Sequence, residues 1–202
     1  MEISELIKSV YPVSDETMGI LLKNLRPRTV KQGETIIREG EVCSEVFFVL
    51  NGTFRNYSFN EGIEHTRWFA IDGDIFTSMF SYINDLPAMS SVDALTNSEV
   101  LVCDTPVARR LIEENHELAM MAYRYIAVGL SEMERRYTFL GRGDAYTRYS
   151  NLIKMRGTDT LNNIKLKYIA SYLGMTPQTL SLVRSRIAKE GRSMNSHNHF
   201  PK

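Results

Sequence analysis

The chain has 202 residues, of which 43% are apolar, and its 24 basic and 24 acidic side chains give no net charge. This length supports one large or two modest domains, and the apolar content is enough to bury real cores. No apolar run approaches the ~20 residues of a membrane span, and the first residues, MEISELIKSVYPVSDE, lack the layout of a signal peptide. We therefore expect a cytoplasmic globular protein with no membrane partner.

The charge is distributed unevenly along the chain. Residues 1–140 hold 13 Lys and Arg against 21 Asp and Glu, a net charge of −8, whereas residues 141–202 hold 11 against 3, a net charge of +8. A basic unit is attracted to phosphate and an acidic unit is repelled by it. The pattern predicts a discrete C-terminal unit that binds nucleic acid.

The period of the apolar side chains changes early in the chain. Residues 2–24 have helical spacing, whereas residues 28–104 contain short β-rich runs such as SEVFFVLNGTFRNYSF and EVLVCD. Glycines separate these runs, as the corners of an antiparallel jelly roll require: Gly33, Gly40, Gly52, Gly62 and Gly73. We predict an α+β fold whose N-terminal domain is a jelly roll, that is, a double-stranded β-helix.

Two features of this β-rich segment have more than one interpretation. A group of aromatic and methionine side chains could line a pocket or simply form the core, which is the favoured interpretation: Trp68, Phe69, Phe76, Met79, Phe80 and Tyr82. Cys43 and Cys103 are far apart and have no C-x-x-C spacing. They are predicted to be reduced, half-buried thiols rather than a disulfide or a metal site.

A heptad pattern follows the β-rich segment. Its positions alternate in steps of four and three residues: Ala119, Tyr123, Ile126, Leu130, Met133, Tyr137 and Leu140. This seam predicts a helix that forms a coiled-coil dimer, the alternative being a stripe that packs only on its own β-domain. A dimer is preferred because a two-fold protein presents two reading helices to successive major grooves about 34 Å apart. Gly141 and Gly143 then mark a hinge.

Residues 166–183 combine the features of a helix-turn-helix. Ala170 is small enough for close helix packing, Gly174 can take the positive φ of a tight turn, and Thr176-Pro177 can begin a second helix. Apolar residues form one seam across both helices: Ile169, Leu173, Met175, Leu180 and Val183. The free face of the second helix would enter the DNA major groove. An ordinary helical hairpin is the alternative, but the coincidence of all these features favours double-stranded DNA as a partner.

Contacts to DNA can be assigned from positions on the second helix. Gln178 is the side chain able to make a bidentate contact, most naturally to adenine. Thr176 and Thr179 are placed for phosphate, and Ser181 for either base or phosphate. Pro177 and Leu182 lie on the free face of the second helix. Arg184 and Arg186 are predicted to contact the DNA backbone, and Lys165 and Lys167 to anchor the first helix.

These elements divide the chain into successive parts. We predict a sensor domain at residues 1–112, a dimerisation helix at 113–140 and an all-α helix-turn-helix domain at 141–190. The polar residues 191–202 have no strand signal, so a disordered tail is predicted rather than a winged hairpin.

A β-roll, a long helix, a glycine hinge and a helix-turn-helix in this order resemble the Crp/Fnr family of bacterial transcription regulators. The resemblance rests on KQGETIIREGEVCSEVFFVLNGTFRNY, with glycines at the family's turns, and on IASYLGMTPQTLS. It implies a β-domain like those that bind cyclic nucleotides, and a homodimer that binds an inverted-repeat promoter site and touches RNA polymerase. Leu182 stands where family members commonly carry a guanine-reading Arg, so it could at most touch a thymine methyl.

The effector cassette departs from the family pattern. In members that bind cyclic AMP, a Gly-Glu pair holds the ribose and an Arg-Ser or Arg-Ala pair holds the phosphate. Here these pairs match Gly73-Asp74 and Ala88-Met89, and no Lys or Arg occurs at residues 68–108. The long helix offers Met133 and Glu134 where small hydroxyls would face the purine. With Ile75 and Phe76 these residues form the candidate effector pocket, for an effector other than cyclic AMP.

Other chemistries are disfavoured too. An iron–sulfur sensor needs about four cysteine ligands, and the chain has two. His65 and His116 are isolated, so a haem ligand is not indicated. A jelly-roll enzyme of the cupin type needs clustered His and Glu, and only His65 lies in the β-region. The remaining alternatives are a cyclic-nucleotide-responsive regulator with an altered cassette and a dimeric adaptor that binds no DNA.

Overall fold

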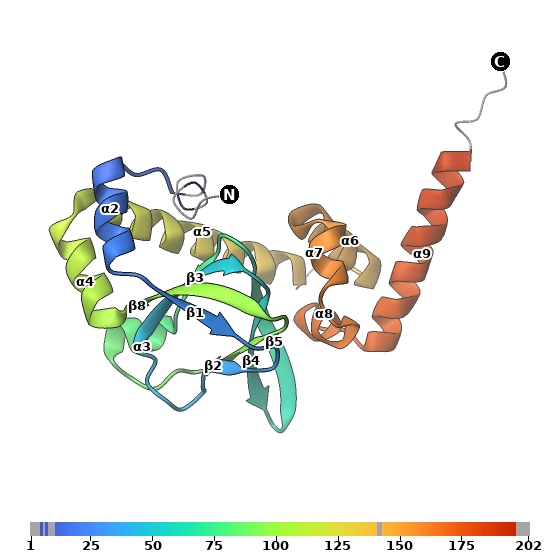
Figure 1. The fold of residues 1–202 in the computed structure, drawn as a ribbon. Coiled ribbons are helices and arrows are strands. Elements are labelled where there is room, and N and C mark those ends of the chain that lie inside the picture. Colours follow the sequence, from blue (N-terminus) through green and yellow to red (C-terminus); the bar gives the residue numbers. More distant parts are fainter. Residues whose placement is uncertain (1–4, 6, 8–10, 141–142, 197–202) are drawn as a thin grey trace, which may run out of the picture. The chain divides into compact units, whose positions relative to one another are not determined.

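A computed structural model describes residues 5, 7, 11–140 and 143–196. It separates into two compact units, Met1–Glu132 and Met133–Lys202, and the boundary between them falls within the long helix α5 (His116–Leu140). Figure 1 shows the β-rich first unit and the helices of the second unit.

Two four-stranded antiparallel sheets form the first unit. The first sheet has the order β1-β8-β3-β6, with β1 at Arg26–Val30, β8 at Ser98–Asp104, β3 at Glu45–Asn51 and β6 at Ile75–Phe76. The second has the order β2-β7-β4-β5, with β2 at Thr35–Ile37, β7 at Ser91–Ala94, β4 at Phe54–Asn60 and β5 at Ile63–Ala70. The predicted jelly roll is confirmed, and each predicted corner glycine from Gly33 to Gly73 has a positive φ.

The first sheet is buried on both faces. Phe47 and Val49 of β3 point into the core between the two sheets, whereas Phe48, between them, packs in a second core outside the roll. Strand β8 divides in the same way, with Val102 in the inner core and Leu101 in the outer one. Because both faces are covered, these strands read as continuous apolar runs rather than as alternating ones.

Three helices supply the outer core. Helices α2 (Asp15–Lys23), α4 (Thr105–Glu114) and α5 lie on the outer face of the first sheet (Figure 1) and contribute Met18, Leu21, Leu111, Leu118 and Met121. The N-cap residue of α2, Ser14, donates from its backbone N–H and its hydroxyl to the Glu117 carboxylate, at 3.0 and 2.6 Å. These bonds lower the pKa of Glu117 and connect α2 to the start of α5.

The structure corrects the predicted elements in three places. Residues 79–84, predicted to be part of the β-rich segment, form helix α3 (Met79–Asn84), which the hydroxyl of Ser78 caps. The helix predicted at 113–140 begins at His116, because α4 occupies Thr105–Glu114. Residues 191–196, predicted to be disordered, continue helix α9 (Pro177–Ser196), and 197–202 lie outside the described residues.

Helices build the described part of the second unit: the end of α5, α6 (Ala145–Arg156), α7 (Thr158–Asn162), α8 (Leu166–Tyr172) and α9. Asp144 caps α6 by accepting a hydrogen bond from the Thr147 backbone N–H at 2.9 Å. Gly141 of the predicted hinge lies outside the described residues, whereas Gly143 has a φ of +88°. Among the described helices, none combines the length and apolar character needed to cross a membrane.

Gly52, in the turn between β3 and β4, gives a first test of the roll. It has a φ of +126°, and an added Cβ would overlap the side chain of Ser98. We expect Gly52→Ala to lower the free energy of unfolding by about 3 kcal/mol, because strain and overpacking combine. Urea unfolding measures this loss. Gly40→Ala is the control, since Gly40 has a positive φ but open space and should lose only about 1 kcal/mol. Equal losses for the two variants would contradict the close approach to Ser98.

Candidate nucleic-acid interface and effector cavity

The turn between α8 and α9 has the geometry that the sequence predicts. Gly174 has a φ of +62°, and the Met175 backbone N–H donates to the Ala170 carbonyl at 3.0 Å. The Thr176 hydroxyl accepts a hydrogen bond from the Thr179 backbone N–H at 3.1 Å, which caps the start of α9. A glycine is required here because this backbone conformation is costly for residues with a Cβ.

One apolar seam holds α8 and α9 together. The predicted seam residues are buried, apart from the half-buried Met175, and so is the small Ala170: Ile169, Ala170, Leu173, Leu180 and Val183. Tyr149 and Leu152 of α6 and Leu161 of α7 are buried in the same unit. The seam therefore turns the opposite face of α9 to the surface. The residues predicted for that face are exposed: Pro177, Gln178, Ser181 and Leu182.

The predicted contacts to the DNA backbone differ in their surroundings. Lys165 and Lys167 are exposed, and the Lys167 ammonium lies 4.9 Å from the centre of the Tyr168 ring. Arg184 is half-buried and donates to the Asn162 side-chain oxygen at 2.9 Å. Arg184 therefore already has a partner within its own unit.

Arg186 is paired as well. Its guanidinium donates to Glu190 at 2.9 Å, and the Tyr146 hydroxyl donates to the other oxygen of that carboxylate at 2.5 Å. The hydrogen bonds from Tyr146 and Arg186 lower the pKa of Glu190. Since the carboxylate stays ionised beside it, Arg186 is a weaker candidate for phosphate than its position alone indicated.

Arg148 on α6 contacts the turn between α8 and α9, and the sequence analysis did not identify this role. Its guanidinium donates to the carbonyl oxygens of Leu173 at 2.9 Å and Gly174 at 3.5 Å, at the end of α8. These carbonyls have no partner within the helix, and a guanidinium can satisfy two of them. Because Arg148 is 25 residues away in sequence, no local pattern could have indicated this contact.

The interior of the β-roll is filled by side chains. The Phe76 ring lies 5.2 Å from the rings of both Phe47 and Phe54 and 5.7 Å from Trp68. Phe47, Phe54 and Phe76 are at most 2% exposed. This confirms the favoured interpretation of Trp68 and Phe76 as core residues.

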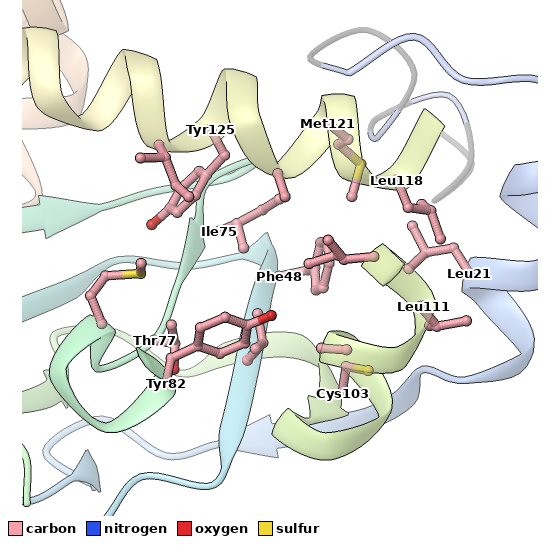
Figure 2. Close-up of a pocket in the computed structure, with 16 residues that line it drawn as sticks. Leu21, Phe48, Ile75, Thr77, Tyr82, Cys103, Leu111, Leu118, Met121 and Tyr125 are labelled. Carbon is pink, nitrogen blue, oxygen red and sulfur yellow. The ribbon is translucent and has the colours of Figure 1, made fainter. Parts of the chain in front are cut away.

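A cavity of about 210 Å³ lies outside the roll, between the first sheet and helices α2 to α5. Figure 2 shows its walls, formed by Phe48 and Ile75 of the sheet, Tyr82 of α3, and residues of α4 and α5. Met79 and Tyr82 line it, whereas Phe80 of the same predicted group is exposed and Phe69 is buried elsewhere. The full lining is Leu21, Val46, Phe48, Ile75, Thr77, Met79, Tyr82, Cys103, Ala108, Leu111, Ile112, Leu118, Met121, Ala122, Tyr125 and Ile126.

Few polar atoms line this cavity. The Thr77 hydroxyl already donates to the Glu45 carbonyl at 2.8 Å. Burial, and then the nearby Asp104 carboxylate, raises the pKa of the Cys103 thiol to about 11, so it is an un-ionised thiol at neutral pH. Burial likewise raises the pKa of Tyr82 and of Tyr125, which keeps both phenols protonated. Both cysteines are free, with Cys43 half-buried as predicted and Cys103 buried.

Helix α5 presents two different faces. Leu118 and Met121 pack in the outer core with the half-buried Tyr125 beside them, whereas the predicted dimer seam lies on another face. From Tyr123 onward the seam residues with described side chains are 51–77% exposed: Tyr123, Ile126, Leu130, Met133 and Tyr137. Ala119 is half-buried, and the side chain of Leu140 lies outside the described residues. Within the first unit, the seam residues Tyr123, Ile126 and Leu130 therefore keep at least half of their surface exposed.

Comparison with known proteins gives consistent results. Residues 27–115 match the cyclic nucleotide-binding domain family. The structure of FixK2 from Bradyrhizobium japonicum superimposes with a TM-score of 0.74 at 20% identity, over 83% of this chain and 86% of that one. A CooA variant from Carboxydothermus hydrogenoformans gives 0.72 at 21%, over 92% and 85%. The chain has the Crp/Fnr fold. The resemblance found in the sequence is thus confirmed.

A curated relative agrees with this assignment. Electron transport regulator A from Shewanella oneidensis is 25% identical over 179 residues, which cover 82% of this chain and 70% of that protein. The name of this relative describes it as a regulator.

The Crp/Fnr cassette residues of the first unit lie in different surroundings. Gly73 and Asp74 form the turn before β6, where the Asp74 carboxylate accepts the Ile71 backbone N–H at 2.9 Å. Ala88 is buried and Met89 is 66% exposed. Phe76 fills the roll, and Ile75 is the one predicted pocket residue that lines the large cavity. Met133 and Glu134 belong to the second unit.

Substitution of Arg148 tests how the turn is held. We expect Arg148→Met to lower the free energy of unfolding by about 1–3 kcal/mol, because the carbonyls of Leu173 and Gly174 lose a charged donor. The measurement is urea unfolding followed by the helical circular dichroism signal. Lys154→Met, on an exposed position of the same helix, is the control and should change stability little. Equal stability of the two variants would show that the Arg148 contacts are dispensable.

Proposed function

We propose that this protein is a cytoplasmic, DNA-binding transcription regulator of the Crp/Fnr type that acts as a homodimer on an inverted-repeat site. The observation that carries the proposal is the geometry of α8 and α9, which leaves a polar, uncovered face on the second helix of a basic unit. Contact with RNA polymerase belongs to the proposal through the family alone. An adaptor role without DNA is the alternative, and the net charge of +8 at residues 141–202 argues against it.

Base reading is assigned to Gln178 in this proposal. It is exposed near the start of α9, which is where helix-turn-helix proteins contact base edges. Its side-chain amide can make a bidentate contact to adenine. The neighbouring Leu182 is 73% exposed and apolar, which suits contact with a thymine methyl group. The remaining contacts are assigned to phosphate, and Ser181 can contact a base instead: Thr176, Thr179, Ser181 and the exposed Lys165 and Lys167.

Substitution of Gln178 tests the reading role. On an inverted-repeat site selected from a random DNA pool, we expect Gln178→Ala to weaken binding by about 1–3 kcal/mol, with little change on generic duplex DNA. Fluorescence anisotropy at two salt concentrations measures both affinities, which should fall steeply as salt rises. Lys167→Ala is the matched control and should weaken binding to both DNAs alike. If Gln178→Ala weakened binding to the selected site and to generic DNA equally, Gln178 would not read bases. DNA binding that is absent or independent of salt would contradict the proposed function.

The homodimer is assigned to the exposed heptad seam of α5. An apolar stripe of this length costs free energy in water and is stabilised when a second helix covers it. A dimer also supplies the two reading helices that an inverted repeat requires.

A charge placed in the seam tests the dimer. We expect Leu130→Glu to convert the protein to a monomer in sedimentation, because two carboxylates would be buried against each other, and to weaken binding to the inverted repeat at least tenfold. Val128→Glu is the control, since Val128 is 59% exposed but lies off the seam. A dimeric Leu130→Glu variant, or a monomeric unmodified protein, would contradict this assignment.

We propose that the effector is not a cyclic nucleotide, although residues 27–115 match that domain family. Three observations support this: aromatic rings fill the roll, the Asp74 carboxylate is bonded within its own turn, and residues 68–108 contain no Lys or Arg. A cyclic phosphate needs a charged or multiple hydrogen-bonding partner. These residues do not fit the nucleotide. The absence of Lys and Arg at residues 68–108 also disfavours an altered nucleotide cassette. The sequence has no suitable cluster of cysteine or histidine residues, which disfavours an iron–sulfur cluster and haem.

A further inference from the structure

We propose that the cavity beneath α5 binds a small, uncharged ring compound with one hydroxyl group, and that this compound is the effector of the regulator. The binding step stands on the cavity alone, whereas the regulatory step rests on the proposed function. The cavity lies outside the roll, against the outer face of the first sheet, and its lining includes none of the cassette residues Gly73, Asp74, Ala88 and Met89.

The volume limits the size of the ligand. An apolar cavity of ~150 Å³ lined by aliphatic and aromatic residues stays dry and accepts benzene. The cavity here has about 210 Å³ and walls of the same character. It therefore has room for a single ring with a short substituent. A purine nucleotide is larger and carries a charge.

The walls exclude a charged ligand. Phe48, Ile75 and Leu118 present hydrocarbon to the cavity, and an ion moved there from water would lose its hydration without gaining a partner. Arg109, the cation beside Tyr82, forms an ion pair with Asp85 at 2.9 Å and lies 5.3 Å from the centre of the Tyr82 ring. It is held outside the cavity and helps to fix the tyrosine.

Tyr82 supplies the polar contact for the ligand. Its hydroxyl points toward the middle of the cavity in Figure 2. Tyr125 of α5 also lines the cavity. A ligand hydroxyl among apolar walls needs a hydrogen-bond partner, and a phenol that faces the cavity can supply one.

The cavity touches the helix that carries the dimer seam. Leu118, Met121, Ala122 and Tyr125 of α5 line it, and Ile126 belongs to both the cavity wall and the seam. A ligand that packs against this wall stabilises one position of α5 relative to others. It therefore shifts the population of the dimer that binds DNA, which is the differential interaction an effector requires.

Two probes of nearly equal shape test the site in the full-length protein. Toluene and benzyl alcohol differ by one hydroxyl group, and isothermal titration calorimetry measures their Kd values. We expect both to bind, with benzyl alcohol about 3- to 10-fold tighter because of its hydrogen bond. Cyclic AMP should give no heat. The Tyr82→Phe variant should bind toluene normally and lose the preference for benzyl alcohol.

Cavity-filling variants locate the bound probe. Ala122→Leu and Ala108→Leu place a larger side chain in the cavity from α5 and α4, and each should weaken both probes at least tenfold while circular dichroism remains native. Ala127→Leu is the matched control, because Ala127 is exposed on the same helix, and it should leave both Kd values unchanged. No binding of either probe, or binding that survives both filling variants, overturns the site.

DNA affinity separates this inference from the proposed function. Benzyl alcohol should change the affinity for the selected inverted repeat at least threefold in the unmodified protein and not in Ala122→Leu. Binding of the probe in calorimetry without this change overturns the effector role. Failure of the unmodified protein to bind DNA at all contradicts the proposed function instead, and the calorimetry still decides the cavity site.

Discussion

The double burial of strands β3 and β8 is the constraint on which the rest of the first unit depends. Phe47 and Val102 anchor the core inside the roll, while Phe48 and Leu101 anchor a second core under α2, α4 and α5. A sheet of this kind gains stability from both faces, since each buried side chain adds apolar area removed from water. The outer core also determines where α5 begins, because Leu118 and Met121 must pack on the outer face of the first sheet. The bonds from Ser14 to Glu117 hold that end of the helix to α2.

The way the roll is packed decides where a ligand can enter. Phe76 closes the interior by contacting Phe47, Phe54 and Trp68 at ring distances of 5.2–5.7 Å. Free volume is instead found on the outer face, where small residues such as Ala108 and Ala122 leave space between the helices and the sheet. The free volume of the first unit is thus lined by apolar side chains. Its polar groups are phenols that burial keeps neutral.

The second unit depends on a tight turn held from two sides. Gly174 provides the backbone conformation, and Arg148 of α6 supplies hydrogen bonds to the carbonyls at the end of α8. The Thr176 cap then begins α9 at a defined residue. Together these contacts determine which face of α9 is exposed. Gln178 and Leu182 lie on that face because Leu180 and Val183 are buried in the seam.

The sequence by itself determined the features that depend on local geometry. Periodicity, corner glycines and caps depend on neighbours within a few residues, so the jelly roll, the α8–α9 turn and the exposed face of α9 were all predictable. Features that need contacts between distant segments were decided only by the tertiary structure. Arg148 meets its partners 25 residues away, Arg186 pairs with Tyr146 across two helices, and the cavity collects side chains from Leu21 to Ile126. Helix α3 and the filling of the roll by Phe76 belong to this class, because their packing depends on strands that are distant in sequence.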